Sequence, residues 1–179
     1  MNRDSLQCIQ IQMLCGQADG ASCNRVAATG GIICNTVKMP PKIVIDTNVL
    51  VSALRSRRGW SFDLLERIGT GQFQHVITVP LVMEYEDVLN RDGMVPLKSA
   101  AINDVLDYIC ASGLRQQVHF LWRPKLADVR DDMVLEAAFN GQCAAIVTWN
   151  LRDFVPARAM GIDVLSPDLF VKRLKEQKS

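Results

Sequence analysis

Short apolar, β-branched segments alternate with helical segments along most of this 179-residue chain, and no other feature of the sequence limits its fold as strongly. Strands are predicted at residues 43–45, 76–79, 118–121 (an edge strand), 144–148 and 164–165. Helices are predicted at residues 48–54, 62–68, 80–89, 100–111, 131–139 and 166–174. Strands that alternate with helices of about ten residues indicate a parallel sheet with helices on both faces. The predicted fold class is therefore α/β.

Local signals support two of these helices. Ser61 is expected to cap the helix at 62–68, because a serine side chain satisfies the free N–H groups of a first turn. Pro80 fits the first turn of the next helix, where its missing N–H costs nothing. The apolar face of that helix is predicted to consist of Leu81, Tyr85, Val88 and Leu89.

The chain changes character at about residue 38. Residues 1–37 are rich in Gln, Gly, Ala, Asn and Cys and show no sustained period of 2 or 3.6. Met39 then opens a segment that leads directly into an apolar strand. We therefore expect residues 1–38 to be a disordered extension or a misassigned start, with a genuine regulatory arm as the alternative, and residues 39–179 to form the domain.

Composition excludes several classes of protein. The formal net charge of +1 argues against a basic protein that coats nucleic acid, although a nuclease remains open because a bound metal can supply positive charge. The six cysteines contain no C-x-x-C pair, which favours scattered reduced thiols over a zinc site. The chain has no secretory signal and no run of about 18 apolar residues that could span a membrane. The expected location is the cytoplasm, without membrane attachment.

Acidic and amide side chains stand at three equivalent points of this pattern. Ligands of parallel sheets bind beyond the carboxyl ends of the strands, where the chain turns into a helix. The candidates at such points are Asp46, Asp131, Asp132, Asn150 and Asp153, and Glu84 lies in the first turns of the helix that begins at Pro80. Each alone also fits a turn, a helix cap or a solvated rim, and acidic residues suit a helix start. Together they are expected to converge at one end of the sheet if their strands are neighbours.

A cluster of carboxylates needs a counter-charge, because like charges raise one another's pKa. Mg²⁺ or Mn²⁺ supplies it, prefers oxygen ligands and requires only one or two carboxylates in addition to water and substrate phosphate. Such a site supports phosphoryl chemistry with water and without a protein nucleophile. The chain has only two histidines, and it lacks both G-x-x-x-x-G-K-[ST] and G-x-G-x-x-G phosphate loops.

Four segments in order resemble the acidic motifs of the PIN domain: residues 43–50 (IVIDTNVL), 80–89 (PLVMEYEDVL), 131–138 (DDMVLEAA) and 146–154 (IVTWNLRDF). The most similar branch comprises toxin components of bacterial type II toxin–antitoxin systems (VapC-like), and residues 161–167 also fit it. The resemblance extends over about residues 39–172. It implies a three-layer α/β/α sandwich with a parallel central sheet, and a Mg²⁺- or Mn²⁺-dependent endoribonuclease that hydrolyses RNA phosphodiester bonds.

The resemblance also implies roles for individual residues. The implied catalytic residues are Asp46, Glu84, Asp132 and Asp153. The implied metal ligands are Asp46, Asp132, Glu84 and Asn150. Two points stay open. The family often has Asp where this chain has the uncharged Asn150, so the number of metal ions bound, one or two, is not decided. Glu86 also competes with Glu84 for the second acidic position.

Further residues are expected to support the site or its partners. Thr47, Asn48, Asp131 and Thr148 are expected to be supporting residues, and Thr47 either positions a ligand or caps the following helix. Arg55, Arg57 and Arg58 form a basic cluster that either contacts RNA phosphates or is a solvated loop. The partners implied are an RNA substrate and a small antitoxin, and a homodimer is also considered.

Two other functions compete with the ribonuclease. A phosphatase with Asp46 as a covalent nucleophile usually needs a second acid two positions later, where this chain has Asn48. A catalytically weak or inactive PIN-like module that binds protein or RNA is the main alternative, and the uncharged Asn150 favours it slightly.

Overall fold

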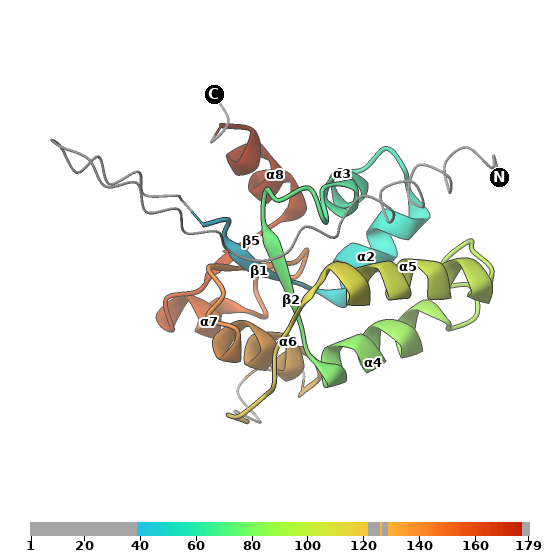
Figure 1. Cartoon of the computed structure of the whole chain (residues 1–179). Helices are drawn as coiled ribbons and strands as arrows, with labels where there is room; N and C mark the ends of the chain where they lie inside the picture. The colour runs from blue at the N-terminus through green and yellow to red at the C-terminus, as the bar shows by residue number, and fades with distance from the viewer. Residues whose placement is uncertain (1–38, 122–125, 127–128, 177–179) are drawn as a thin grey trace, which may run out of the picture. The chain divides into compact units, whose positions relative to one another are not determined.

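The computed structural model describes residues 39–121, 126 and 129–176, so the predictions for residues 1–38 lie outside the described part of the chain. Within these ranges the strands are β1 (Lys42–Ile45), β2 (Gln74–Ile77), β3 (Leu114–Arg115), β4 (Ala145–Val147) and β5 (Asp163–Leu165). They form one sheet in the order β3-β2-β1-β4-β5, and every pair of neighbours is parallel. β1 lies in the centre of the sheet (Figure 1), where Ile43 is opposite Ala145 of β4.

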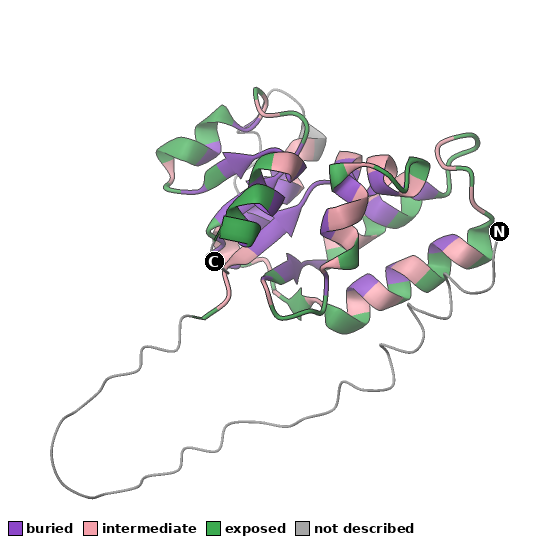
Figure 2. Ribbon diagram, turned by 90° about the horizontal axis from the view of Figure 1, so that it is seen from above, coloured by how far each residue is buried: buried purple, intermediate pink, exposed green. Residues whose placement is uncertain are grey.

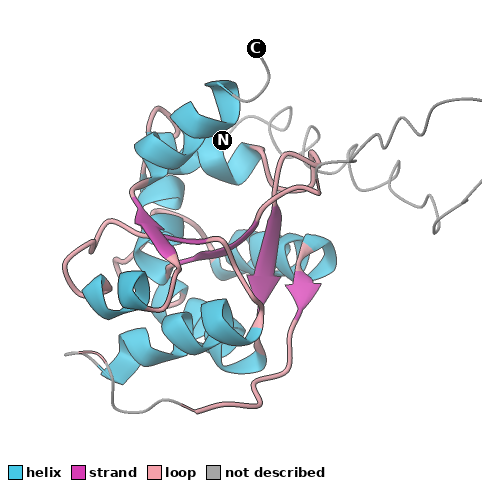
Figure 3. Ribbon diagram, turned by 90° about the vertical axis from the view of Figure 1, so that its left-hand side faces the viewer, coloured by secondary structure: helices cyan, strands magenta, loops and turns pink. Residues whose placement is uncertain are grey.

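Helices lie on both faces of this sheet, which confirms the predicted α/β fold (Figure 3). The helices within the described ranges are α2 (Thr47–Arg55), α3 (Trp60–Glu66), α4 (Val79–Leu89), α5 (Ser99–Ser112), α6 (Val129–Asn140), α7 (Val155–Ala159) and α8 (Pro167–Glu176). α3 packs on α2 and α8, whereas α6 packs on β1, β2 and β4. α4 contacts α2, α5 and α6, and so it joins the two helical layers at one side of the molecule.

Burial explains why the strands are short and continuously apolar. All three residues Ile43–Ile45 are buried, because helices cover β1 on both sides (Figure 2). On α4 the residues Leu81, Tyr85 and Leu89 are buried as predicted, and Val88 is partly buried. The Tyr85 hydroxyl donates a hydrogen bond to the Ile45 carbonyl, so α4 is attached to the last residue of β1.

Three local predictions were wrong. The edge strand is β3 at Leu114–Arg115, where it pairs with β2, and residues 118–121 form no strand. β2 ends at Ile77 instead of residue 79, because Thr78 caps α4 and accepts a hydrogen bond from the Leu81 N–H at 3.4 Å. α3 begins at Trp60 after Gly59, so Ser61 lies inside the helix and does not cap it.

The helix α7 was missed by the periodicity because it has only five residues. Across the described ranges, none of the helices combines the length and apolarity that crossing a membrane requires.

Candidate functional site

Asp46 occupies the carboxyl end of the central strand, as the sequence predicted. Its N–H donates to the Val147 carbonyl of β4 at 2.9 Å, and the residue is the N-cap of α2. Its side chain is only 4% exposed. Oδ2 accepts hydrogen bonds from Asn48 Nδ2 and from Thr148 Oγ1, both at 2.6 Å. The carboxylate is therefore fixed in one orientation by residues from the start of α2 and the end of β4.

Thr148 is the centre of this network. Its fully buried hydroxyl donates to Asp46 and accepts from Asn48 Nδ2 at 3.1 Å and from the Asn150 N–H at 2.9 Å. A hydroxyl has one proton and two lone pairs, so all of its hydrogen-bonding capacity is used. Asn48 Oδ1 also accepts from the Trp149 N–H at 3.2 Å. These contacts bring together the two segments that the sequence singled out, 46–48 and 148–150.

Burial raises the pKa of Asp46 above its ordinary value, and the hydrogen bonds from Thr148 and Asn48 oppose that effect. The charge of Asp46 in turn contributes, after burial, to raising the pKa of Tyr85. A carboxylate that has lost its water and is only partly compensated by neutral donors favours a nearby cation.

A cavity of about 570 Å³ opens beside Asp46, between α2, α4 and α6. Its acidic and amide lining residues are Asp46, Asn48, Glu84, Asp131 and Asn150. The remaining lining residues are Thr47, Val51, Ser52, Arg55, Ser56, Val88, Arg91, Met94 and Val134. The predicted convergence is thus found for carboxylates from three elements: the end of β1, α4 and the start of α6.

Of the two adjacent acids in α6, Asp131 lines the cavity, whereas Asp132 is not among its lining residues. Asp132 is fully buried, and its Oδ1 accepts a hydrogen bond from the Leu126 N–H at 2.9 Å. Neighbouring residues in an α-helix point about 100° apart, and of these two only Asp131 is a lining residue of the cavity. The sequence motif alone did not show which one it is.

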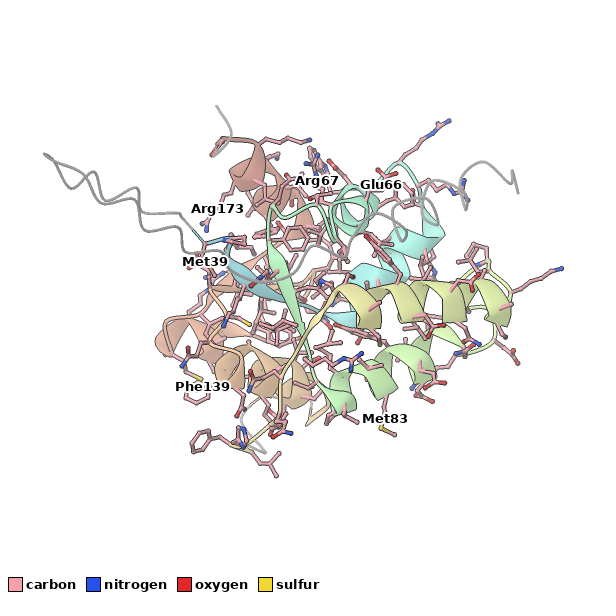
Figure 4. The ribbon with its side chains drawn as sticks, viewed as in Figure 1. Met39, Glu66, Arg67, Met83, Phe139 and Arg173 are labelled. Atoms are coloured by element: carbon pink, nitrogen blue, oxygen red, sulfur yellow. The ribbon has the colours of Figure 1, made fainter. Side chains whose placement is uncertain are left out.

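Of the other predicted acidic residues, one lines the cavity and the others do not. Glu84 lines the cavity, whereas the competing Glu86 is exposed and lines a separate groove between α4 and α5. Met83, the residue before Glu84, points away from the sheet (Figure 4). Asp153 does not line the cavity; its N–H donates to the Asn150 carbonyl at 3.2 Å and helps to shape the turn after β4.

One of the three arginines in the basic cluster lines the cavity. Arg55 lines the cavity, and its Nε donates to the Met94 carbonyl at 2.6 Å. Arg57 and Arg58 are exposed in the turn after α2 and are not lining residues. Sequence reasoning missed Arg91, which follows the C-cap of α4 at Asn90 and lines the cavity beside Glu84.

The donor set fits a hard divalent cation only in part. Within the described ranges, no three Asp, Glu, His or Cys side chains lie close enough to form a complete metal site. Mg²⁺ usually keeps several waters and binds through one or two carboxylates together with substrate phosphate. Asp46, with a neighbouring carboxylate and amide oxygens around an open cavity, meets that requirement.

Comparisons with known proteins identify a family for this chain. A family model described as "PIN domain" matches residues 42–152. The comparison with curated proteins found no match. Among solved structures, the chain is similar to VapBC2 from Rickettsia felis bound to a DNA fragment from their promoter, with 13% identity and a TM-score of 0.49 over 70% of this chain and 98% of that one. It is also similar to FitAB bound to an IR36 DNA fragment, with 15% identity and a TM-score of 0.49 over 70% of this chain and 94% of that one.

Proposed function

This chain belongs to the PIN-domain family, and on that premise we propose that it is a Mg²⁺- or Mn²⁺-dependent endoribonuclease. The observation that carries the proposal is the convergence of Asp46, Glu84 and Asp131 on one cavity. The carboxylates come from separate elements, and they offer the oxygen ligands that Mg²⁺ and Mn²⁺ prefer. Hydrolysis of a phosphodiester bond is the chemistry that such a cation supports without a protein nucleophile.

We assign roles to the residues from their positions. Asp46 and Asp131 would hold the cation because both line the cavity, and Asp131 is preferred to Asp132, the residue that the motif favours, because Asp132 is not a lining residue. Glu84 completes the acidic wall, and Asn150 offers an uncharged oxygen. When bound, the metal lowers the pKa of a coordinated water and stabilises charge on the phosphate.

Residues behind the carboxylates orient them. Thr148 and Asn48 hold Oδ2 of Asp46, so this oxygen keeps its direction whether or not substrate is bound. Preorganised groups of this kind avoid the cost of reorganisation during the reaction. Asp153 acts through the turn that presents Asn150, by its backbone contact, and not as a ligand.

The direct test is cleavage of a fluorescently labelled single-stranded RNA by the purified full chain. We expect cleavage with Mg²⁺ or Mn²⁺, none with EDTA, and recovery when excess metal is added back. The Asp46→Asn variant, which keeps the shape of the side chain but loses its charge, should be inactive. Metal-independent cleavage, or equal activity of the Asp46→Asn variant, would contradict the proposal.

One alternative has a specific observation behind it. The described residues contain no complete three-residue metal site, and Asn150 is uncharged. Both features are also expected of a PIN-like module that binds RNA or protein without cutting it. Binding of the labelled RNA with no cleavage under any metal would favour this alternative over the nuclease.

We further propose that the protein is the toxin component of a type II toxin–antitoxin system, with a small antitoxin as its partner. A basic side chain of the antitoxin, best an Arg, would enter the cavity and pair with Asp46 or Asp131. Metal and Arg then compete for the same oxygens, so each should weaken the binding of the other by the same factor. Titrating the complex with Mg²⁺ measures this competition. Affinity that does not depend on Mg²⁺ would indicate that the partner covers the RNA-binding face instead.

A further inference from the structure

Two arginines from distant parts of the chain lie on the rim of the acidic cavity. Arg55 is the last residue of α2, and Arg91 follows α4 by two positions. Both line the cavity that also contains Asp46, Glu84 and Asp131. Arg91 in addition lines the groove between α4 and α5, so it stands at the border between the two hollows.

Each of these arginines is held by one edge of its guanidinium. Arg55 Nε donates to the Met94 carbonyl at 2.6 Å, and Nη2 lies 4.0 Å from Met94 Sδ. Arg91 Nη2 donates to the Asp87 carboxylate, one helical turn earlier. The Met94 N–H donates to the Arg91 carbonyl at 3.0 Å, so a single turn connects the two arginines. A guanidinium has five N–H donors, and these contacts leave several for a further acceptor.

The charges of the cavity indicate which acceptor this is. Three carboxylates repel an anionic substrate, and a single divalent cation does not neutralise them together with a phosphate. Arginine binds phosphate through two parallel hydrogen bonds and remains charged at any physiological pH. Arg57 and Arg58 follow Arg55 in sequence but are not lining residues of the cavity.

We propose that Arg55 and Arg91 form a clamp for the backbone phosphate of the RNA substrate beside the carboxylates. This inference rests on the proposed function and deepens it. Phosphate contacts position a nucleic acid but carry no sequence information. The clamp should therefore act on affinity for any single-stranded RNA, and on KM more than on kcat.

The test compares Arg55→Gln and Arg91→Gln with Arg58→Gln, a matched loss of an exposed arginine outside the cavity. Binding of a fluorescein-labelled single-stranded RNA is followed by anisotropy in EDTA, at several salt concentrations. For each clamp variant we expect a loss of affinity of about fivefold and a salt dependence shallower by about 0.7 in the slope of log K against log salt. Arg58→Gln should stay within about twofold of wild type in affinity, because it removes no phosphate contact at the cavity.

Two further variants separate the clamp from folding. Arg91→Lys keeps the positive charge but loses the two parallel donors of the guanidinium. Its slope of log K against log salt should equal that of wild type, whereas its affinity for RNA should lie between those of Arg91→Gln and wild type. Asp87→Asn removes the ion pair that Arg91 makes on α4. Exposed pairs of this kind contribute little to stability, so the melting temperature of the Asp87→Asn variant should match that of wild type.

The outcomes distinguish the clamp from the nuclease. RNA binding that depends on Arg55 and Arg91, without cleavage in Mg²⁺, supports the clamp and contradicts the proposed function. Cleavage that is unaffected in both clamp variants, or equal losses in Arg58→Gln, overturns the clamp and leaves the nuclease intact. A wild-type protein that binds no RNA overturns the clamp as well.

Discussion

Thr148→Val should expose how strongly the site depends on one hydroxyl. Valine keeps the shape of the buried side chain but removes the donor to Asp46 and the acceptor for Asn48 and for the Asn150 N–H. A hydrogen bond to a charged group contributes about 1.5–3 kcal/mol. Asn48 and Asn150 are half-buried and exposed, so water can replace the bonds that they lose. We therefore expect the free energy of unfolding at neutral pH to fall by about 2–3 kcal/mol.

At about 3 °C per kcal/mol for a chain of this size, the melting temperature should fall by about 6–9 °C. The effect must depend on pH. Burial raises the folded-state pKa of Asp46, and loss of the Thr148 donor raises it further. When the folded-state pKa lies above the unfolded-state value, ionisation costs stability, and this cost appears as the pH rises through the folded-state pKa. The difference in melting temperature between variant and wild type should therefore grow from acid to neutral pH.

Calorimetry across this pH range measures the difference, and Thr148→Ser is the matched control because it keeps the hydroxyl. The acid limb of the cleavage rate should also move to higher pH in Thr148→Val. A melting temperature within about 2 °C of wild type at neutral pH, less than 1 kcal/mol at this size, together with an unchanged acid limb, would refute the reasoning.

Four further substitutions test the assignments. Asp46→Asn should abolish cleavage yet raise the melting temperature at neutral pH, because it removes an ionised buried carboxylate whose pKa is raised; the gain should disappear in scans below the ordinary Asp value of 3.8. Asp131→Asn should abolish cleavage, whereas Asp132→Asn should lower the melting temperature, because Asp132 is fully buried and bonded to the backbone; an Asp131→Asn variant that cleaves RNA as well as wild type would contradict the assignment of Asp131. Tyr85→Phe removes the donor to the Ile45 carbonyl and should lower the free energy of unfolding by about 1–2 kcal/mol in a denaturant titration.

Much of the fold could be predicted from the sequence, because local pattern and tertiary packing agree in most elements. The strand Lys42–Ile45 is continuously apolar, as a strand covered on both faces must be, and Asp46 follows it directly. Parallel pairing then places the end of β4 beside it. The placement of segment 148–150 next to Asp46 therefore follows from topology and needs no knowledge of side-chain contacts.

The choice between Asp131 and Asp132 lies beyond such reasoning. The two residues are adjacent acids in the same first turn, and their patterns are equivalent. The rotation of α6 decides between them, and the segment before the helix contributes to that rotation through the contact between Leu126 and Asp132. Leu126 lies outside any helix or strand, so the periodic pattern of apolar residues does not predict its contact with Asp132.

The same limit applies to Ser61 and to the edge strand. Serine is a common N-cap residue, but the Ser61 hydroxyl accepts a hydrogen bond from Trp149 Nε1 at 3.0 Å, and Trp149 is 88 residues away in the sequence. β3 has only two residues, and both are exposed. Its position is set by the free edge of β2 and not by a pattern in its own sequence.

The central place of β1 affects how the protein is made. β1 pairs with β4, and the side chains of Asp46 and Thr148 that meet there are separated by 102 positions in the sequence. At synthesis rates of about 5–20 residues per second, roughly 5–20 s pass on the ribosome between the two. During that interval the nascent chain contains Asp46, Glu84 and later Asp131, but β1 has no partner on one side. A chain that stops before β4 therefore carries the acidic residues without the site that they form.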